Sequence, residues 1–175
     1  DSHLSMPIIN HDWERLRTVE LPPFEDAIHN GVGAILAAHV LFPALESNPR
    51  LPATLSHNVL TKLLREQLGF EGLIFTDCME MEAITKQYSM GEAAVLAIEA
   101  GVDVVLVSHT PERQSEAYWA VVEAVKTGRI SMDRIEQSYN RVKAAKEALV
   151  ATKDLARTLN TPEHQEVMKQ VVRES

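Results

Sequence analysis

Apolar runs of strand-like length recur along the chain, and each follows a helix-compatible segment that ends at a glycine. Residues 27–39 and 97–109 share the pattern Ala-Ile-x-x-Gly-Val-x-x-(Ile or Val)-Leu-x-x-His. A looser third copy, residues 63–77, has a leucine-rich helical stretch, a glycine, and an apolar run that leads to Asp77. Glycine readily adopts the left-handed conformation that commonly ends helices. The pattern therefore predicts three helix-glycine-strand units.

The polar residues that end these runs stand in the same register. Eight positions separate the glycine from the terminal polar residue in all three units. Strands buried on both faces read as continuous apolar runs, and strands that alternate with helices form parallel sheets. We therefore expect His39, Asp77 and His109 to gather at the carboxyl edge of a parallel sheet, where barrels and open α/β sheets place their active sites. Each residue could instead be a polar strand terminator without a chemical role.

Helical periodicity and end signals predict the elements around these strands. They indicate helices near residues 12–19, 22–30, 56–68, 80–87, 91–100, 112–126, 131–151 and 163–173. The Arg and Lys side chains of the 131–151 helix are interpreted as a solvated surface, and Glu80 as a first-turn acid that favours its helix dipole. Three βα units cannot close a barrel and would leave open sheet edges, so the sequence predicts an incomplete domain.

Composition and charge narrow the class of protein. The 175 residues are 45% hydrophobic and 24% charged, which is typical of a globular chain, and the net charge of -8 argues against a nucleic-acid partner. Cys78 is the single cysteine, which excludes an internal disulfide. No apolar run reaches the roughly 18 residues of a membrane span. We expect no cofactor and no bound metal, and the compartment stays open, with a cytoplasmic location favoured over a secreted or lipid-anchored one.

Two short motifs carry groups that could do chemistry. Asp77 ends an apolar strand, where a carboxylate can act as nucleophile, general base or metal ligand. Asp1 and His3 can hydrogen-bond in a turn, which raises the basicity of the imidazole for proton transfer near neutral pH. Either motif could also be a polar loop segment without a role. The absence of a starting methionine beside such a motif suggests that the numbering begins inside a longer chain.

Several segments resemble the β-N-acetylglucosaminidases of glycoside hydrolase family 3. Asp1-Ser2-His3, followed by Met6-Pro7, is similar to the element that carries the family's acid/base histidine, and Ile74 to Met81 is similar to its nucleophile segment. Further similar segments follow in the same order at residues 20–24, 38–43, 52–56 and 64–70. The resemblance spans roughly residues 1–150. It departs from the family pattern at Met6, where another Leu is common, and at Cys78, where a small residue is frequent.

The resemblance implies a fold and a domain organisation. The chain would be α/β and form the C-terminal portion, about strands 6 to 8 with flanking helices, of a (β/α)8 TIM barrel that is incomplete on its own. Residues 1–152 would belong to this catalytic domain. Residues 153–175 would form a linker and a helix that leads to an absent second domain.

The resemblance also implies an activity. The family hydrolyses terminal β-linked N-acetylhexosamine with retention, through a covalent glycosyl-enzyme, and cell-wall muropeptides are among the substrates expected from it. Asp77 would be the nucleophile, His3 the acid/base and Asp1 its support. His39, Met79 and His109 are expected to contact the substrate, with structural roles as the alternative for the two histidines.

Two alternatives stay open. His3, His39, Asp77 and His109 could converge on one cation, as in a metal-dependent TIM-barrel hydrolase. The chain could also be a non-catalytic half-barrel module that pairs with the missing N-terminal half. The expected partners are accordingly a glycoside substrate, that missing half and a C-terminal domain, and the fragment alone is expected to be inactive.

Overall fold

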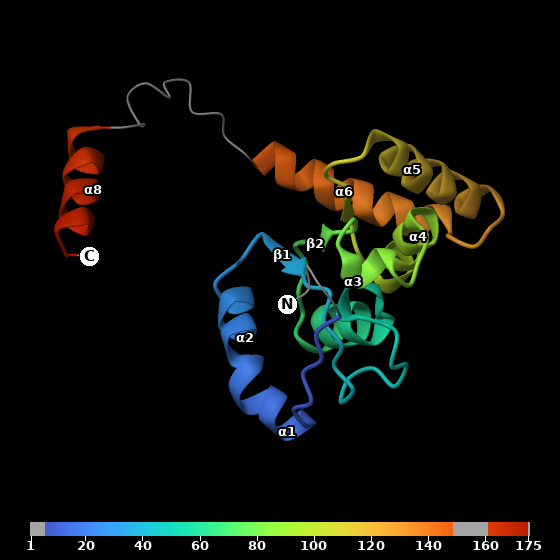
Figure 1. Cartoon of the computed structure of the whole chain (residues 1–175), viewed down its shortest axis with the longest axis horizontal. Coiled ribbons are helices and arrows are strands. Elements are labelled where there is room, and N and C mark those ends of the chain that lie inside the picture. Colours follow the sequence, from blue (N-terminus) through green and yellow to red (C-terminus); the bar gives the residue numbers. More distant parts are fainter. Residues whose placement is uncertain (1–5, 149–160, 175) are drawn as a thin grey trace. The chain divides into compact units, whose positions relative to one another are not determined.

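The computed structural model describes residues 6–148 and 161–174 of the chain (Figure 1). The chain divides into two compact units between Ala145 and Lys146. The first unit contains a parallel sheet and most of the helices, and the second contains α8 (Pro162–Glu174). The predicted acid/base pair, Asp1 and His3, lies outside the described residues, as does most of the predicted linker.

The sheet consists of three parallel strands, as the repeated pattern predicted. Strands β1 (Ala34–Ala37), β2 (Leu73–Cys78) and β3 (Val104–Leu106) lie in the order β1-β2-β3. The β1-β2 register runs without interruption from Ala34 beside Leu73 to Ala37 beside Thr76. Since β2 is the central strand, the carboxyl end of β2 lies between the ends of its two neighbours.

Helices connect and flank these strands close to the predicted ranges. They are α1 (Trp13–Arg15), η1 (Leu16–Glu20), α2 (Pro22–His29), η2 (Ala53–Leu55), η3 (Asn58–Gln67), α3 (Glu82–Thr85), α4 (Met90–Ala100), α5 (Pro111–Lys126) and α6 (Met132–Ala148). The helix predicted for residues 80–87 is shorter than expected. Glu80 precedes α3, so the interpretation of Glu80 as a first-turn acid of its own helix is wrong.

Glycines end the helices in front of all three strands. Gly31, Gly69 and Gly101 have positive φ angles of 76°, 70° and 120°, which other residues adopt at a cost. At Gly101 a side chain would also collide with η3, since a β-carbon there would lie 2.6 Å from Thr61 Oγ1. The glycine signals that predicted the units are therefore confirmed as backbone requirements.

The core of the first unit surrounds β2. Ile74 and Met79 are fully buried and pack with Leu60 and Leu64 of η3 and with Ala93 and other small residues of α4. Small side chains on α4 let this helix approach the sheet closely. Among the described residues, no helix is both long and apolar enough to cross a membrane.

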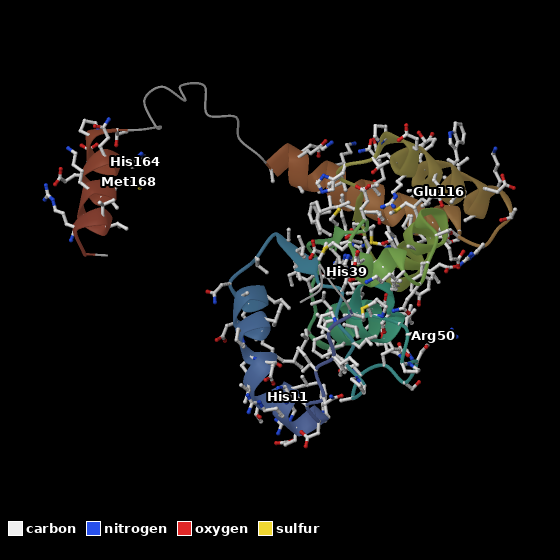
Figure 2. All side chains as sticks on the ribbon, viewed as in Figure 1. His11, His39, Arg50, Glu116, His164 and Met168 are labelled. Atoms are coloured by element: carbon white, nitrogen blue, oxygen red, sulfur yellow. The ribbon has the colours of Figure 1, made fainter. Side chains whose placement is uncertain are left out.

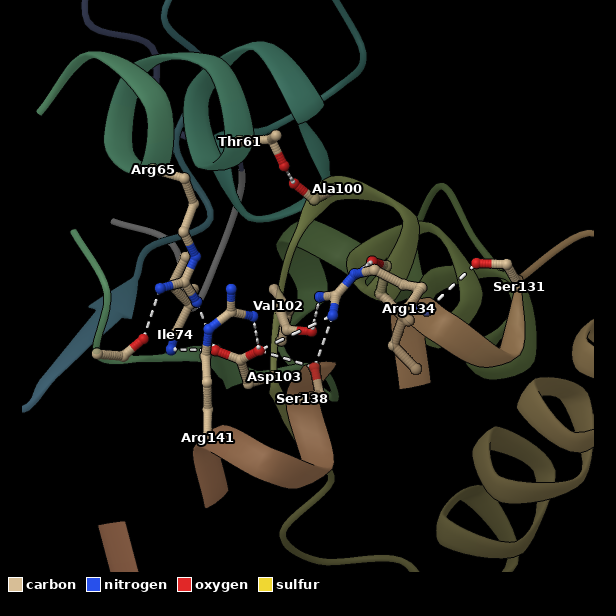
Figure 3. Close-up of polar contacts among 12 residues, drawn as sticks. Thr61, Arg65, Ile74, Ala100, Val102, Asp103, Ser131, Arg134, Ser138 and Arg141 are labelled. Carbon is tan, nitrogen blue, oxygen red and sulfur yellow. Dashed lines mark hydrogen bonds and ion pairs between the residues drawn. The ribbon is translucent and has the colours of Figure 1, made fainter. Parts of the chain in front are cut away.

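A buried carboxylate ties helices to the amino end of the sheet. The Asp103 side chain has no exposed surface, and its oxygens accept hydrogen bonds from Ile74 N (3.0 Å), Ser138 Oγ (2.7 Å) and Arg141 Nη1 (3.1 Å) (Figure 3). Arg65 of η3 also pairs with this carboxylate. Asp103 therefore joins η3, β2 and α6 at the sheet edge opposite Asp77.

This arrangement corrects the interpretation of α6 as carrying an ordinary solvated surface of basic side chains. Arg134 donates to the carbonyl oxygens of Ile98 (3.1 Å) and Val102 (2.7 Å), and its side chain is 18% exposed. Arg141 pairs with Asp103. These two arginines are attachment points of α6, which periodicity alone could not distinguish from solvated residues.

Candidate active site

Asp77 lies in an irregularity near the carboxyl end of β2. Phe75 pairs with Val104 and Cys78 with Leu106, so three steps along β2 are matched by two along β3. This mismatch is a β-bulge, a feature that turns side chains toward a site at the end of a strand. The bulge places Asp77, the predicted nucleophile, in a half-buried position.

Side-chain and backbone groups replace the regular ladder at the bulge. The Leu106 N–H donates to the hydroxyl oxygen of Thr76 (2.8 Å), and the Leu106 carbonyl accepts from Met79 N (2.9 Å). Thr76 is fully buried. The chain is thus held on both sides of Asp77 while Asp77 itself stands out of the ladder.

The Asp77 carboxylate has a single hydrogen bond among the described residues. The Cys78 N–H donates to its Oδ1 at 2.7 Å. A carboxylate bound to one backbone N–H keeps lone pairs for a substrate. The geometry therefore leaves Asp77 able to act as a nucleophile.

His39 reaches β2 from the loop after β1. It is fully buried in the first unit (Figure 2). Its Nε2 lies 3.0 Å from the carbonyl oxygen of Cys78, and its Nδ1 lies 2.9 Å from Oγ1 of Thr54. Since a carbonyl oxygen accepts only, Nε2 must carry the proton.

The protonation of His39 follows from the same surroundings. Burial lowers the pKa of His39 from its ordinary value, while the bond to the Cys78 carbonyl and the charge of Asp77 act in the opposite direction. The neutral ring with a protonated Nε2 can accept a hydrogen bond from the Thr54 hydroxyl at Nδ1. That hydroxyl also lies 2.8 Å from the Ala38 carbonyl oxygen, to which it can donate as an alternative.

Two of the residues that are predicted to contact the substrate are buried. His39 and Met79 have no exposed surface in the described structure. Any further part of the protein can only increase their burial. Their burial places both side chains among the residues that support β2, and contact with the substrate stays a prediction.

His109 is exposed at the same edge of the sheet, beside Glu80. The Glu80 carboxylate accepts from His109 N (2.6 Å) and Thr110 N (3.1 Å), immediately before α5. Bonding to Thr110 is the main cause that lowers the pKa of Glu80 from its ordinary value. Glu80 thus joins the loop after β2 to the start of α5, and it leaves the imidazole of His109 accessible.

The described residues bring together a different set of metal-binding groups from the one predicted. Donor atoms of Cys78, Glu80 and His109 all lie within 4.8 Å of one another. His39 cannot join Asp77 and His109 on a cation, because both of its ring nitrogens are engaged. The described residues therefore give no support to the alternative in which His39 joins a cation site.

Comparison with known proteins decides the family. The model of the glycosyl hydrolase family 3 N-terminal domain matches residues 1–145. The chain belongs to glycosyl hydrolase family 3. The resemblance of its motifs to this family is thereby confirmed.

Several known proteins are similar to the chain in sequence or in structure. A β-N-acetylglucosaminidase from Paenibacillus sp. str. FPU-7 is 47% identical, with a TM-score of 0.88 over 98% of this chain and 34% of that one. The zinc-bound structure of CbsA from Thermotoga neapolitana is 35% identical, with a TM-score of 0.79 over 86% of this chain and 33% of that one. Beta-hexosaminidase A from Pseudoalteromonas piscicida is 29% identical over 94% of this chain and 31% of that protein.

The family 3 chain spans about one third of the length of these relatives. Within that third, sequence reasoning placed Asp77 at the end of a strand, but it missed the hydrogen bonds that Thr54 and Thr76 make beside it. Both hydroxyls are fully buried. A threonine that directly precedes the predicted nucleophile was the available signal for Thr76, whereas nothing local marks Thr54 as a partner of a histidine 15 positions earlier.

Proposed function

We propose that the chain is the C-terminal part of the catalytic barrel of a retaining β-N-acetylglucosaminidase. Family membership and 47% identity to a family 3 β-N-acetylglucosaminidase support this activity. The single observation that carries the proposal is the bulge that presents a half-buried aspartate at the carboxyl end of the central strand. Substrates with terminal β-linked N-acetylhexosamine, cell-wall muropeptides included, are the class that we propose.

The sheet supports the proposal that further strands complete a barrel. Among the described strands, β1 and β3 each pair with β2 alone. Leu36, on the outer strand β1, is 55% exposed, which is unusual for a leucine within a parallel strand. In the proposed barrel, residues 1–152 supply about strands 6 to 8, and residues 153–175 lead toward a second domain.

The proposed reaction has two steps at the anomeric carbon. In the first, a carboxylate oxygen of Asp77 forms a bond to this carbon while the bond to the leaving oxygen breaks, and His3 gives that oxygen a proton. In the second, His3 takes a proton from water, and the water oxygen displaces Asp77. Asp1 offsets the positive charge that His3 carries between proton transfers. The configuration is retained because the anomeric carbon is inverted twice.

Covalent labelling tests the nucleophile. We expect a fluorinated N-acetylglucosaminide probe, which slows breakdown of the glycosyl-enzyme, to add one sugar mass to the complete enzyme. Peptide mapping should place the sugar on Asp77. The Asp77→Asn variant should not be labelled, whereas Glu82→Gln should label as the wild type does, since Glu82 lies exposed in the next helix. An active enzyme labelled at another carboxylate would refute the assignment.

A further inference from the structure

We propose that His39 is a positioning residue that holds Asp77 in place through the backbone of Cys78. The inference rests on the proposed function, in which Asp77 is the nucleophile. It departs from the expectation that this histidine contacts the sugar. It also gives the Thr54 hydroxyl a role, as the group that orients the ring.

The contacts of a single peptide group carry the argument. The peptide between Cys78 and Met79 is held at both ends: its oxygen accepts from His39 Nε2 (3.0 Å), and its N–H donates to the Leu106 carbonyl (2.9 Å). One partner follows β1 and the other ends β3. The peptide that follows the bulge is therefore fixed from both neighbouring strands.

The same backbone reaches the carboxylate itself. Cys78, whose carbonyl accepts from His39, donates its N–H to Asp77 Oδ1 (2.7 Å). Rotation of the Cys78 backbone would move both groups together. Cys78 pairs with Leu106 of β3, whereas the register of β1 with β2 ends at Ala37 and Thr76. The imidazole supplies a restraint from the side of β1, where strand pairing has ended.

Thr54 fixes the direction in which the ring points. It is fully buried beside Nδ1, and its Oγ1 also lies 2.8 Å from the Ala38 carbonyl. The hydroxyl can donate to the Ala38 carbonyl or turn to Nδ1, and donation to Nδ1 matches the ring form with its proton on Nε2, which the Cys78 carbonyl requires. Without this hydroxyl, Nδ1 would lose its hydrogen-bond partner in either ring form, and the Cys78 carbonyl alone would hold the ring.

Two substitutions at position 39 separate positioning from substrate contact. The amide nitrogen of His39→Gln can occupy the place of Nε2 and donate to the Cys78 carbonyl, whereas the shorter side chain of His39→Asn cannot. In the complete enzyme we expect His39→Asn to lower kcat roughly ten- to hundredfold with KM within about twofold, because a small displacement of a reacting group costs this much. His39→Gln should recover kcat to within about threefold of the wild type.

The opposite pattern would overturn the inference. A rise in KM at unchanged kcat in both variants would mean that the imidazole binds the sugar directly. Equal losses of kcat in both variants would mean that the bond to Cys78 does not matter. If His39→Asn fails to fold, Thr54→Val and Thr54→Ser decide: the first should lower kcat and the second should restore it, and equal kcat values for this pair would refute the role of the hydroxyl.

A nitrogen NMR spectrum of the complete enzyme tests the geometry without any reaction. With ¹⁵N-labelled histidine, the signal that disappears in His39→Gln should show a neutral ring with its proton on Nε2 at pH 7. A proton on Nδ1 would refute the inference. The labelling experiment and this spectrum can fail independently. If the label falls on a residue other than Asp77 but the spectrum shows the proton on Nε2, the proposed function is wrong and the hydrogen bond of His39 to Cys78 still stands.

Discussion

At the scale of single residues, two carboxylates near the end of β2 differ in how many hydrogen bonds they accept. Within the described part of the chain, Asp77 receives one hydrogen bond, whereas Glu80, three positions later, accepts from two backbone N–H groups. Both residues follow the same apolar run. Both are carboxylates, but their hydrogen-bond partners differ: Asp77 keeps free lone pairs, whereas Glu80 holds two backbone N–H groups in place.

Glu80 should stabilise the protein only where its carboxylate is charged. Because the folded state lowers the pKa of Glu80, this stabilisation is present above about pH 4.5, the ordinary pKa, and is lost as the pH falls through the lower folded pKa. We expect Glu80→Gln to lower the thermal midpoint at pH 7, and its difference from the wild type to shrink as the pH is lowered below 4.5. Thermal unfolding monitored by circular dichroism measures both midpoints.

Glu82→Gln is the matched control, since Glu82 is exposed and pairs with Lys86 one turn away. Its thermal midpoint should stay within about 1 °C of the wild type, because exposed ion pairs contribute little. A difference between Glu80→Gln and the wild type that does not shrink on acidification would contradict a role for the charge.

At the scale of elements, Asp103 anchors helices at the amino end of the sheet. Two arginines, Arg65 and Arg134, are no more than 18% exposed and face this carboxylate together with Arg141. Burial lowers the pKa of Arg65 and of Arg134, and the Asp103 charge opposes that effect. The negative charge of Asp103 therefore offsets the positive charges of all three arginines.

Asp103→Asn should destabilise the protein by roughly 3 kcal/mol or more, because it leaves partly buried arginines without their counter-charge. Urea unfolding measures the change in free energy. Asp133→Asn, on the exposed first turn of α6, is the control and should change it by less than about 1 kcal/mol. Equal stabilities of the two variants would show that the network does not hold the helices.

At the scale of the whole molecule, the three-stranded sheet has the open edges expected of a partial barrel. Both outer strands have one partner among the described strands. The groups that would recognise the sugar hydroxyls and the N-acetyl group are expected on other strands. In the proposed function, the described site supplies the nucleophile and its support, and the complete site needs further residues.

The isolated 175-residue chain should therefore not hydrolyse an aryl β-N-acetylglucosaminide. The complete enzyme should, and release of the aryl group measured by absorbance compares the two. The Asp77→Asn form of the chain sets the background rate. Turnover by the wild-type chain above that background would contradict the partial-barrel proposal.

Metal removal should leave the complete enzyme active. Both oxygens of Glu80 already accept backbone hydrogen bonds, and His39 is engaged at both nitrogens, so we expect no catalytic cation at this edge. Dialysis against a chelator should change kcat/KM by less than about twofold. A loss of activity that added zinc restores would instead favour a metal-dependent hydrolase.

The sequence by itself determined the features that depend on neighbouring residues. The glycines that end helices before β1, β2 and β3 require positive φ angles, and the apolar runs after them form parallel strands. These signals are local, because helix ends and strand burial leave their mark within about ten residues. The order of the units then placed Asp77 at the end of a strand, which the structure confirms.

Tertiary structure alone decided which polar residues support the site. His39 and His109 occupy equivalent positions in repeated patterns, yet His39 is buried against Cys78 and His109 is exposed. The bulge beside Asp77 arises from the pairing of β2 with β3, whose residues lie about 30 positions apart in the chain. Hydrogen bonds between such distant residues depend on how strands and helices pack, and a local pattern does not record that packing.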